Sequence, residues 1–273
     1  MKVKEYIIVL IIIIALLTLD VMVVEPNMVK VERLKLEFEN IDEKLDGLKI
    51  VQISDLHFGT YGFREELVIN LINYLKPDLI VITGDLINNA DGIKDLIKFL
   101  KKLRAPLGIY CVYGNWDHWS GVNLTKLRIL LKKECNVTVL VNEYVIIEYN
   151  GTSFYLIGVD DPHTGHDNIK EAYPKTNERF KILLAHSPEI LGNIKGYKVN
   201  LILVGHTHGG QIVLPLIGPL FLPLRGEYRK YVSGLYKVNG TYMYVNRGLG
   251  TSIIPIRLLC SPEITLIRIR VKK

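Results

Sequence analysis

Five short fragments of the sequence contain the residue types that bind divalent metal ions. Each follows an apolar run, and five of the chain's 7 histidines lie in them. Imidazole, carboxylate and amide oxygen together suit borderline ions such as Mn, Fe, Zn, Ni or Co. The fragments are Asp55-Leu56-His57, Gly84-Asp85, Gly114-Asn115-Trp116-Asp117-His118, Ala185-His186-Ser187-Pro188 and Gly205-His206-Thr207-His208-Gly209-Gly210.

The spacing inside two of the fragments predicts chelation. Residues i and i+2 of extended backbone point to the same side, so we expect Asp55 and His57 to bind one ion together. His206 and His208 share a side by the same rule, unless a bulge of the glycine-rich loop divides them between two ions. Glycines directly before three of the candidate ligands would let the backbone pass close to the ions or to phosphate.

A ligand set of this kind suits a pair of ions. Two ions about 3.5–4 Å apart can hold a hydroxide nucleophile between them and stabilise an in-line displacement. Because the set has only two carboxylates, Asp55 and Asp85, part of the charge of two divalent ions stays uncompensated. Such a site attracts a phosphate ester. The predicted chemistry is hydrolysis of phosphomonoesters or phosphodiesters.

In this order, the five fragments resemble the calcineurin-like metallophosphoesterases. The wider pattern is similar to their membrane-associated, phosphodiesterase-like branch in bacteria and archaea. Residues 158–162, Gln211 after its glycine pair and residues 247–252 add to the likeness, which spans about residues 48–270. The resemblance implies an α/β fold, a β-sandwich of two mixed sheets flanked by helices.

The resemblance also implies how two metal ions are divided among the ligands, with Asp85 bridging them. One ion would be held by the residues Asp55, His57, Asp85 and His208. The other would be held by the residues Asp85, Asn115, His186 and His206.

One fragment departs from the family pattern. The family motif reads Gly-Asn-His followed by Asp or Glu, and its histidine is the acid that protonates the leaving oxygen. Here Trp116 takes that position and a histidine comes two residues later, at His118. We expect His118 to supply the proton or to contact the phosphate, and Asn115 to act in catalysis as well as in metal binding. Asn88 and His163 are further candidate substrate contacts, although a solvated loop position is the alternative for His163.

Buried strands must position these fragments. Apolar runs alternate with segments of helical spacing in the first half, which predicts parallel strands covered by helices. Because sites collect at the carboxyl ends of strands in such sheets, distant fragments can converge. The expected helices are 63–75, 93–103 and 124–131. The expected strands are 28–39, 48–53, 79–82, 109–113, 137–140, 143–149, 152–159, 180–185, 200–204, 210–214, 230–237, 241–246 and 263–270, with hairpin turns at 150–151 and 239–240.

An apolar run at residues 6–24, interrupted by Asp20, opens the chain. A membrane span needs about 20 apolar residues, so we expect a membrane anchor or signal over 1–25 and the catalytic domain over 26–273. A cleaved signal and a buried helix are the alternatives, but no small-x-small cleavage site follows. Because long domains are translocated largely regardless of their charge, we place the catalytic domain outside the cytoplasm.

A second apolar stretch, residues 212–224, contains three prolines, which argues against a helix or a central strand. Arg225, Arg229 and Lys230 follow it. Beside the metal fragments, such a loop could enter a membrane or hold an acyl chain, and the alternative is a loop folded onto the core. A lipid or envelope-precursor headgroup is therefore an expected substrate.

Composition narrows the remaining alternatives. The net charge of +6 fits an anionic substrate or membrane surface, but no long basic run signals nucleic acid. Three widely spaced cysteines favour neither a disulfide framework nor a zinc–cysteine site. A phosphodiesterase or nuclease with a soluble substrate is one alternative, although a nuclease would need a longer basic track. An inactive metal-binding scaffold is the other, and only Trp116 supports it.

Overall fold

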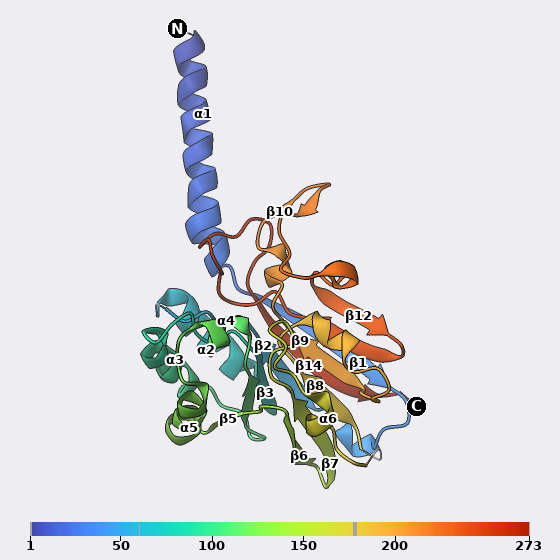
Figure 1. Cartoon of the computed structure of the whole chain (residues 1–273). Coiled ribbons are helices and arrows are strands. Elements are labelled where there is room, and N and C mark those ends of the chain that lie inside the picture. Colours follow the sequence, from blue (N-terminus) through green and yellow to red (C-terminus); the bar gives the residue numbers. More distant parts are fainter. Residues whose placement is uncertain (1, 60, 177–178, 273) are drawn as a thin grey trace.

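Two mixed β-sheets form the body of the molecule (Figure 1). The structure is a computed structural model that describes residues 2–59, 61–176 and 179–272. The first sheet has the strand order β1-β14-β2-β3-β4-β5. Its strands are β1 (Lys30–Phe38), β2 (Lys49–Ile53), β3 (Leu79–Thr83), β4 (Ile109–Val112), β5 (Val137–Val139) and β14 (Glu263–Val271).

The second sheet has the strand order β12-β13-β9-β8-β7-β6. A separate two-stranded hairpin, β10-β11, comes from the proline-containing apolar stretch. The strands are β6 (Glu143–Tyr149), β7 (Thr152–Gly158), β8 (Lys181–Leu184), β9 (Leu201–Val204), β10 (Val213–Leu214), β11 (Gly218–Pro219), β12 (Gly234–Val238) and β13 (Thr241–Val245).

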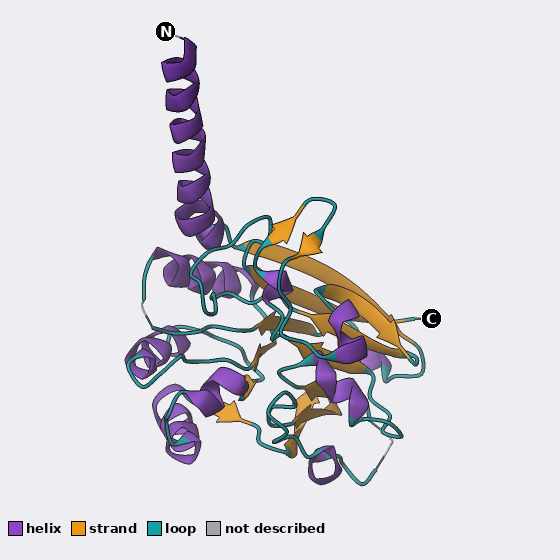
Figure 2. Ribbon diagram, turned by 45° about the horizontal axis from the view of Figure 1, so that its top comes forward, coloured by secondary structure: helices purple, strands orange, loops and turns teal. Residues whose placement is uncertain are grey.

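Helices cover the outer faces of the two sheets (Figure 2). Those packed on the first sheet are α2 (Phe63–Leu75), α3 (Gly92–Leu100) and α5 (Leu124–Cys135). The short α6 (Ile169–Ala172) and the 3₁₀ turn η4 (Pro188–Gly192) pack on the second. Because one apolar cluster joins both sheets between them, the expected α/β sandwich of two mixed sheets flanked by helices is confirmed.

Strand β3 shows why its sequence is apolar without alternation. Leu79 and Val81 face the core between the sheets, whereas Ile80 and Ile82 face the helices on the outer side. Both faces of a central parallel strand are covered, so every position is buried. Strands β2 to β5 pair in parallel, as predicted, and β14 inserts antiparallel to β2 at the other side.

The two predicted hairpin turns are confirmed. Asn150 and Gly151 connect β6 to β7, and Asn239 and Gly240 connect β12 to β13. All four residues have positive φ angles, between 48° and 85°, which is the backbone that matches the twist of antiparallel strands.

Several segments differ from expectation, and the short α6 and β11 were not predicted either. The strand expected at 230–237 begins only at Gly234, because Gly226–Lys230 forms a 3₁₀ turn. The strand expected at 210–214 shortens to β10, because Gly209 and Gly210 adopt positive φ angles of 62° and 87°. The helix α4 (Asn115–Trp119) was not predicted, since its five residues are too few to show helical spacing.

The N-terminal run forms the helix α1 (Lys2–Leu19), which continues through a π-helical turn (Asp20–Val24) and a 3₁₀ turn (Glu25–Asn27). It projects from the domain in both views (Figures 1 and 2). The span Val3–Asn27 is long and apolar enough to cross a membrane, with a mean hydropathy of 3.2, and its apolar window is 0% buried. The alternative of a buried helix is therefore wrong.

Candidate metal centre

Five strands bring the candidate ligands to one edge of the sandwich. Each strand ends two or three residues before a candidate, and the strands come from both sheets. The candidates that follow β2, β3, β4, β8 and β9 are Asp55, Asp85, Asn115, His186 and His206, respectively. The expected convergence at the carboxyl ends of the strands is confirmed.

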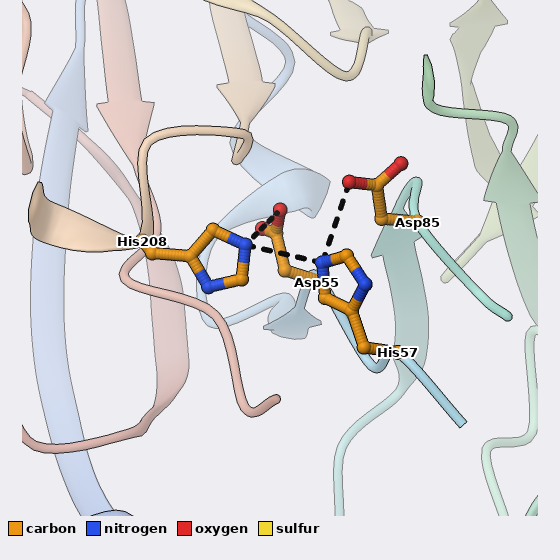
Figure 3. Close-up of side chains that lie close together, drawn as sticks. All are labelled: Asp55, His57, Asp85 and His208. Carbon is orange, nitrogen blue, oxygen red and sulfur yellow. Dashed lines mark hydrogen bonds and ion pairs between the residues drawn. The ribbon is translucent and has the colours of Figure 1, made fainter. Parts of the chain in front are cut away.

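Four side chains form a first group, and Figure 3 shows them pointing toward one another. Asp55, His57, Asp85 and His208 each offer one ligand atom, and these atoms all lie within 4.8 Å of one another. His57 Nε2 is 3.1 Å from His208 Nε2 and 3.4 Å from Asp85 Oδ2. His208 Nε2 is 3.4 Å from Asp55 Oδ1.

A second group shares Asp85 with the first. Asp85, His186 and His206 offer ligand atoms within the same limit of 4.8 Å. His186 Nε2 is 3.3 Å from Asp85 Oδ2, 3.1 Å from His206 Nδ1 and 3.1 Å from Asn115 Oδ1. The structure thus brings all seven predicted ligands together in the two expected sets, and it divides His206 and His208 between them.

The backbone around the ligands is not the extended chain that we predicted. Asp55 and His57 have φ angles of 51° and 48°, so the i, i+2 argument for their shared side is wrong. Asp85, His206 and His208 also have positive φ, at 52°, 71° and 50°. These five ligands therefore sit at sharp turns after their strands, and the turns aim their side chains into the cluster.

The glycines before the ligands give the cluster its room. A Cβ atom on Gly205 would collide with Ser54 Oγ and Asp55 Oδ2. One on Gly84 would collide with the ring of His186, and one on Gly114 with Asp85 Oδ1. These glycines permit a close approach of the backbone to neighbouring side chains of the cluster, and the predicted approach to ions or phosphate stays a prediction.

Backbone carbonyls fix the tautomers of two histidines. His186 Nδ1 lies 2.8 Å from Thr83 O, and His206 Nε2 lies 3.0 Å from Pro223 O. A carbonyl only accepts, so these nitrogens donate, and His186 Nε2 and His206 Nδ1 are the nitrogens that would bind metal. Such partners orient metal-binding histidines.

The buried carboxylates of the cluster favour a bound cation. All seven ligands are at most 6% exposed, and no described lysine or arginine forms an ion pair with Asp55 or Asp85. Burial raises the pKa of Asp55, and burial lowers the pKa values of His206 and His208 well below their ordinary range. Burial acts the same way on His186, but Asp85 and Asp55 outweigh it and raise the pKa of His186 well above its ordinary range. A divalent ion would take the place of that proton, and imidazole beside buried carboxylate is the donor set that such ions need, so these residues fit the expected ions.

His118 lies beside the cluster, with its ring turned to other partners. Its Nε2 is 2.8 Å from Asp160 Oδ1, and its ring stacks on His166 at 4.0 Å between centroids. The hydrogen bond to Asp160 raises the pKa of His118. It is Trp116, with its ring 5.5 Å from that of His57, that lines the cavity over the ligands.

The structure also places the two residues that we predicted as substrate contacts, Asn88 and His163. Asn88 Oδ1 lies 2.7 Å from His57 Nδ1, so Asn88 orients a candidate ligand. His163 lines the cavity, its ring is 4.5 Å from that of His206, and its Nδ1 is 2.7 Å from Glu189 Oε2. Glu189 was not predicted, although it directly follows the fragment 185–188, because nothing in the sequence links it to His163 in another loop.

Asp117 is a structural residue that sequence reasoning passed over. Its carboxylate is buried and accepts hydrogen bonds from the backbone N–H groups of Leu86, Ile87 and Gly114. It thereby ties the turn after β3 to the turn after β4. Its position in the fragment 114–118 was the available signal.

A cavity of about 560 Å³ opens over the ligands. Its floor includes Asp85, Asn115, His206 and His208. The remaining walls come from α4, the segment 210–225 and the loop 252–254. A phosphate ester could enter this cavity and reach both groups of ligands.

Comparisons with known proteins agree with this geometry. Residues 48–210 match the family of calcineurin-like phosphoesterases. The chain is 39% identical over 253 residues to the metallophosphoesterase YkuE of Bacillus subtilis (strain 168). The matched residues are 90% of this chain and 87% of that protein.

Two other relatives carry more descriptive names. Phosphodiesterase YaeI of Escherichia coli (strain K12) is 30% identical over 254 residues, or 90% of each chain. A transmembrane protein with metallophosphoesterase domain from Bos taurus is 34% identical over 241 residues, which are 81% of this chain and 52% of that protein.

Proposed function

Because the chain belongs to the calcineurin-like phosphoesterase family, we propose that it hydrolyses phosphomonoesters or phosphodiesters with two divalent metal ions. The buried cluster of seven ligand side chains at the floor of an open cavity supports this proposal most directly. Its mixture of imidazole, carboxylate and amide donors suits Mn, Fe, Zn, Ni or Co.

The two sets of ligands have separate tasks in this proposal. Asp55, His57 and His208 would hold one ion, His186, His206 and Asn115 would hold the other, and Asp85 is placed to serve both. Divalent ions bound here would neutralise the charge of the phosphate and supply a strong nucleophile from water. Asn88, Thr83 and Pro223 hold three of the imidazoles in their orientations.

The leaving oxygen needs a proton donor, and two histidines are candidates. His118 is paired with Asp160, but it is not among the described residues that line the cavity. His163 lines the cavity and is paired with Glu189. Replacing each by alanine separates them, because the donor's loss lowers turnover by roughly 10²–10⁴-fold while the metal content stays intact.

The apolar helix α1 and the transmembrane relatives indicate membrane anchoring. We propose that residues 1–25 are the anchor, that residues 26–273 are the catalytic domain, and that this domain lies outside the cytoplasm. A substrate carried by the membrane, such as the headgroup of a lipid or of an envelope precursor, fits this location.

The proposal is tested with the full chain in detergent. Metal is removed with a chelator, each candidate ion is restored in turn, and hydrolysis of p-nitrophenyl phosphate and bis-p-nitrophenyl phosphate is followed. We expect restored activity that Asp85→Ala abolishes and that Asp91→Ala, an exposed aspartate, retains. Metal binding without hydrolysis of either ester would support an inactive scaffold instead.

A further inference from the structure

The cavity over the ligands has an apolar wall that hydrolysis of a phosphate group does not require. We infer that this wall binds the hydrocarbon chain of a membrane amphiphile whose phosphate group reaches the metal cluster. The inference deepens the proposed function and rests on it. The wall is formed by Trp116, Trp119, Ile212, Leu220, Phe221, Pro223, Ile253 and Ile254.

The wall is open to solvent as it stands. Trp119, Leu220, Phe221, Ile253 and Ile254 are between 50% and 79% exposed. Five large apolar side chains around one cavity are an uncommon surface for a protein that meets only water. Pockets of this size with an apolar lining and a few polar groups at one end are typical of small-molecule sites. The shape fits an apolar chain with a phosphate at its end.

The backbone holds the wall residue Ile253 and the hairpin residue Leu216 outward at an energetic cost. Ile253 has a φ angle of 56° and Leu216, at the tip of the β10-β11 hairpin, has one of 68°. Left-handed backbone is unfavourable for branched side chains and persists where the surroundings impose it. Their side chains are 79% and 108% exposed, so packing within the chain does not offset that cost. Burial of these side chains in hydrocarbon would offset it.

The wall lies where the membrane helix enters the domain. The loop 252–259 is hydrogen-bonded to the end of that helix, from Arg257 N to Val21 O at 2.9 Å and from Leu259 N to Glu25 Oε2 at 2.7 Å. The β10-β11 hairpin rises on the same side of the domain (Figures 1 and 2).

The segment 210–225 and the loop 252–259, which both contribute residues to the cavity, are also joined to each other. Val213 N donates to Leu258 O at 2.9 Å, and Leu258 N donates to Gln211 O at 3.0 Å. Since α1 fixes the loop next to the bilayer, the hairpin is held there as well. The mouth of the cavity therefore faces the place where the hydrocarbon chains of lipids begin.

Charge at the rim agrees with an anionic headgroup. Arg225 lines the cavity, and Arg229 and Lys230 follow it on the exposed 3₁₀ turn. Basic residues near a bilayer are attracted to anionic lipids. One end of the site thus favours phosphate and the other favours hydrocarbon, which is the division of an amphiphile.

The chain's 2 tryptophans, Trp116 and Trp119, both line the cavity and report on it directly. The full chain is placed in phosphatidylcholine nanodiscs with Mn²⁺ and titrated with dodecylphosphonate that carries bromine on its chain. Bromine quenches tryptophan fluorescence, and the C–P bond is not an ester. We expect saturable quenching that methylphosphonate and brominated dodecane do not reproduce.

Substitutions in the wall complete the test. Phe221→Asp and Ile253→Asp should each weaken the quenching by about tenfold, because the hydrocarbon loses one large apolar contact. Ile129→Asp, at an exposed position of α5, is the matched control and should leave it unchanged. Equal quenching by brominated dodecane, or quenching that ignores both wall substitutions, would overturn the inference.

Hydrolysis of bis-p-nitrophenyl phosphate and p-nitrophenyl phosphate is measured in the same samples. It distinguishes failure of the hydrocarbon site from failure of the proposed hydrolase activity. Turnover of either ester together with quenching that ignores the wall overturns the hydrocarbon site and leaves the hydrolase intact. Saturable, wall-dependent quenching without turnover of either ester supports the hydrocarbon site and counts against the proposed hydrolase.

Discussion

The candidate ligands reach the cluster through unusual backbone at single residues. Five of them, Asp55, His57, Asp85, His206 and His208, have positive φ angles. This conformation costs roughly 1–2 kcal/mol for a residue with a Cβ atom, and such strain collects at functional sites. The glycines next to these turns leave room for the neighbouring ligands. The cluster should therefore be sensitive to a single added methyl group.

Gly205→Ala tests this sensitivity. The new Cβ would meet Ser54 Oγ and Asp55 Oδ2, so either the turn after β9 or the carboxylate must move. We expect the affinity for Mn²⁺ to fall by at least about tenfold, as for the loss of a residue that orients a ligand. Gly59→Ala, where nothing lies within 4 Å, is the control, and metal content after dialysis is the measurement. Equal retention in both variants would contradict the tight packing.

The pair of His118 and Asp160 makes a pH-dependent prediction. Its hydrogen bond raises the pKa of His118, although burial acts in the opposite direction. If His118 donates the proton, activity falls as pH rises through that pKa. Asp160→Asn removes the charge and lowers the pKa, so the alkaline limb of kcat/KM should move to lower pH. An alkaline limb that stays in place would remove His118 as donor and leave His163.

The residue types predicted the cluster, whereas the backbone conformation of individual ligands could not be predicted from the sequence. The position of the five fragments after apolar runs predicted that they converge, and the family resemblance predicted how the seven ligands divide into two sets. The left-handed backbone at Asp55 was not predictable, because nothing in an Asp-Leu-His run marks it. The pairing of His163 with Glu189 was missed for a similar reason, since it joins two loops separated by 26 residues.

At the scale of elements, the loop 247–261 connects the membrane helix to the cluster. Leu249 N donates to Ser54 O at 2.9 Å and Gly250 N donates to Asp55 O at 2.7 Å. The fully buried Arg257 holds the loop together by donating to the carbonyls of Arg247, Gly248, Gly250 and Cys260. A change at the helix end therefore acts on the surroundings of Asp55.

Glu25 is the residue through which the helix end holds this loop. It is 7% exposed and accepts from Leu259 N at 2.7 Å and Cys260 N at 2.6 Å. Glu25→Ala removes the acceptor of both N–H groups, and the buried one, at Cys260, then costs about 1–3 kcal/mol. We expect the melting temperature to fall by several degrees, about 2–4 °C per kcal/mol for a domain of this size.

Glu148→Ala, at an exposed position of β6, is the control for that measurement. Equal melting temperatures for the two variants would contradict the clamp. A loss of stability would also argue for placing the catalytic boundary before Glu25.

Elements with enough apolar residues were predictable, and short ones were not. The run 79–82 indicated β3 because burial on both faces leaves a continuous signature. The β10-β11 hairpin lay in a stretch whose prolines excluded a helix, but nothing in the stretch showed that it would project beside α1.

At the scale of the whole molecule, α1 and the β10-β11 hairpin lie on the same side of the domain (Figure 1), and residues next to the hairpin line the cavity. Under the proposed function, the anchor would confine the enzyme to the layer in which a lipid substrate is concentrated. Binding to a tethered partner gains from effective concentration rather than from new contacts. The anchor should therefore matter for a substrate in the bilayer and not for a soluble one.

Deletion of residues 1–19 tests the role of the anchor while keeping Glu25. We expect the shortened chain to hydrolyse a soluble ester at the rate of the full chain. Its activity on a p-nitrophenyl ester of a long-chain alkyl phosphate in vesicles should fall by about 10²-fold. The same loss on both esters would point to misfolding, and no loss on either would mean that the anchor does not serve catalysis.

The most direct measurement of the central claim is the number of Mn²⁺ equivalents required for full ester hydrolysis by the metal-free chain. The structure predicts a plateau at two equivalents, because two groups of ligands share Asp85. Asp85→Ala should abolish the response. A plateau at one equivalent, or hydrolysis that does not depend on metal, would contradict a paired metal centre.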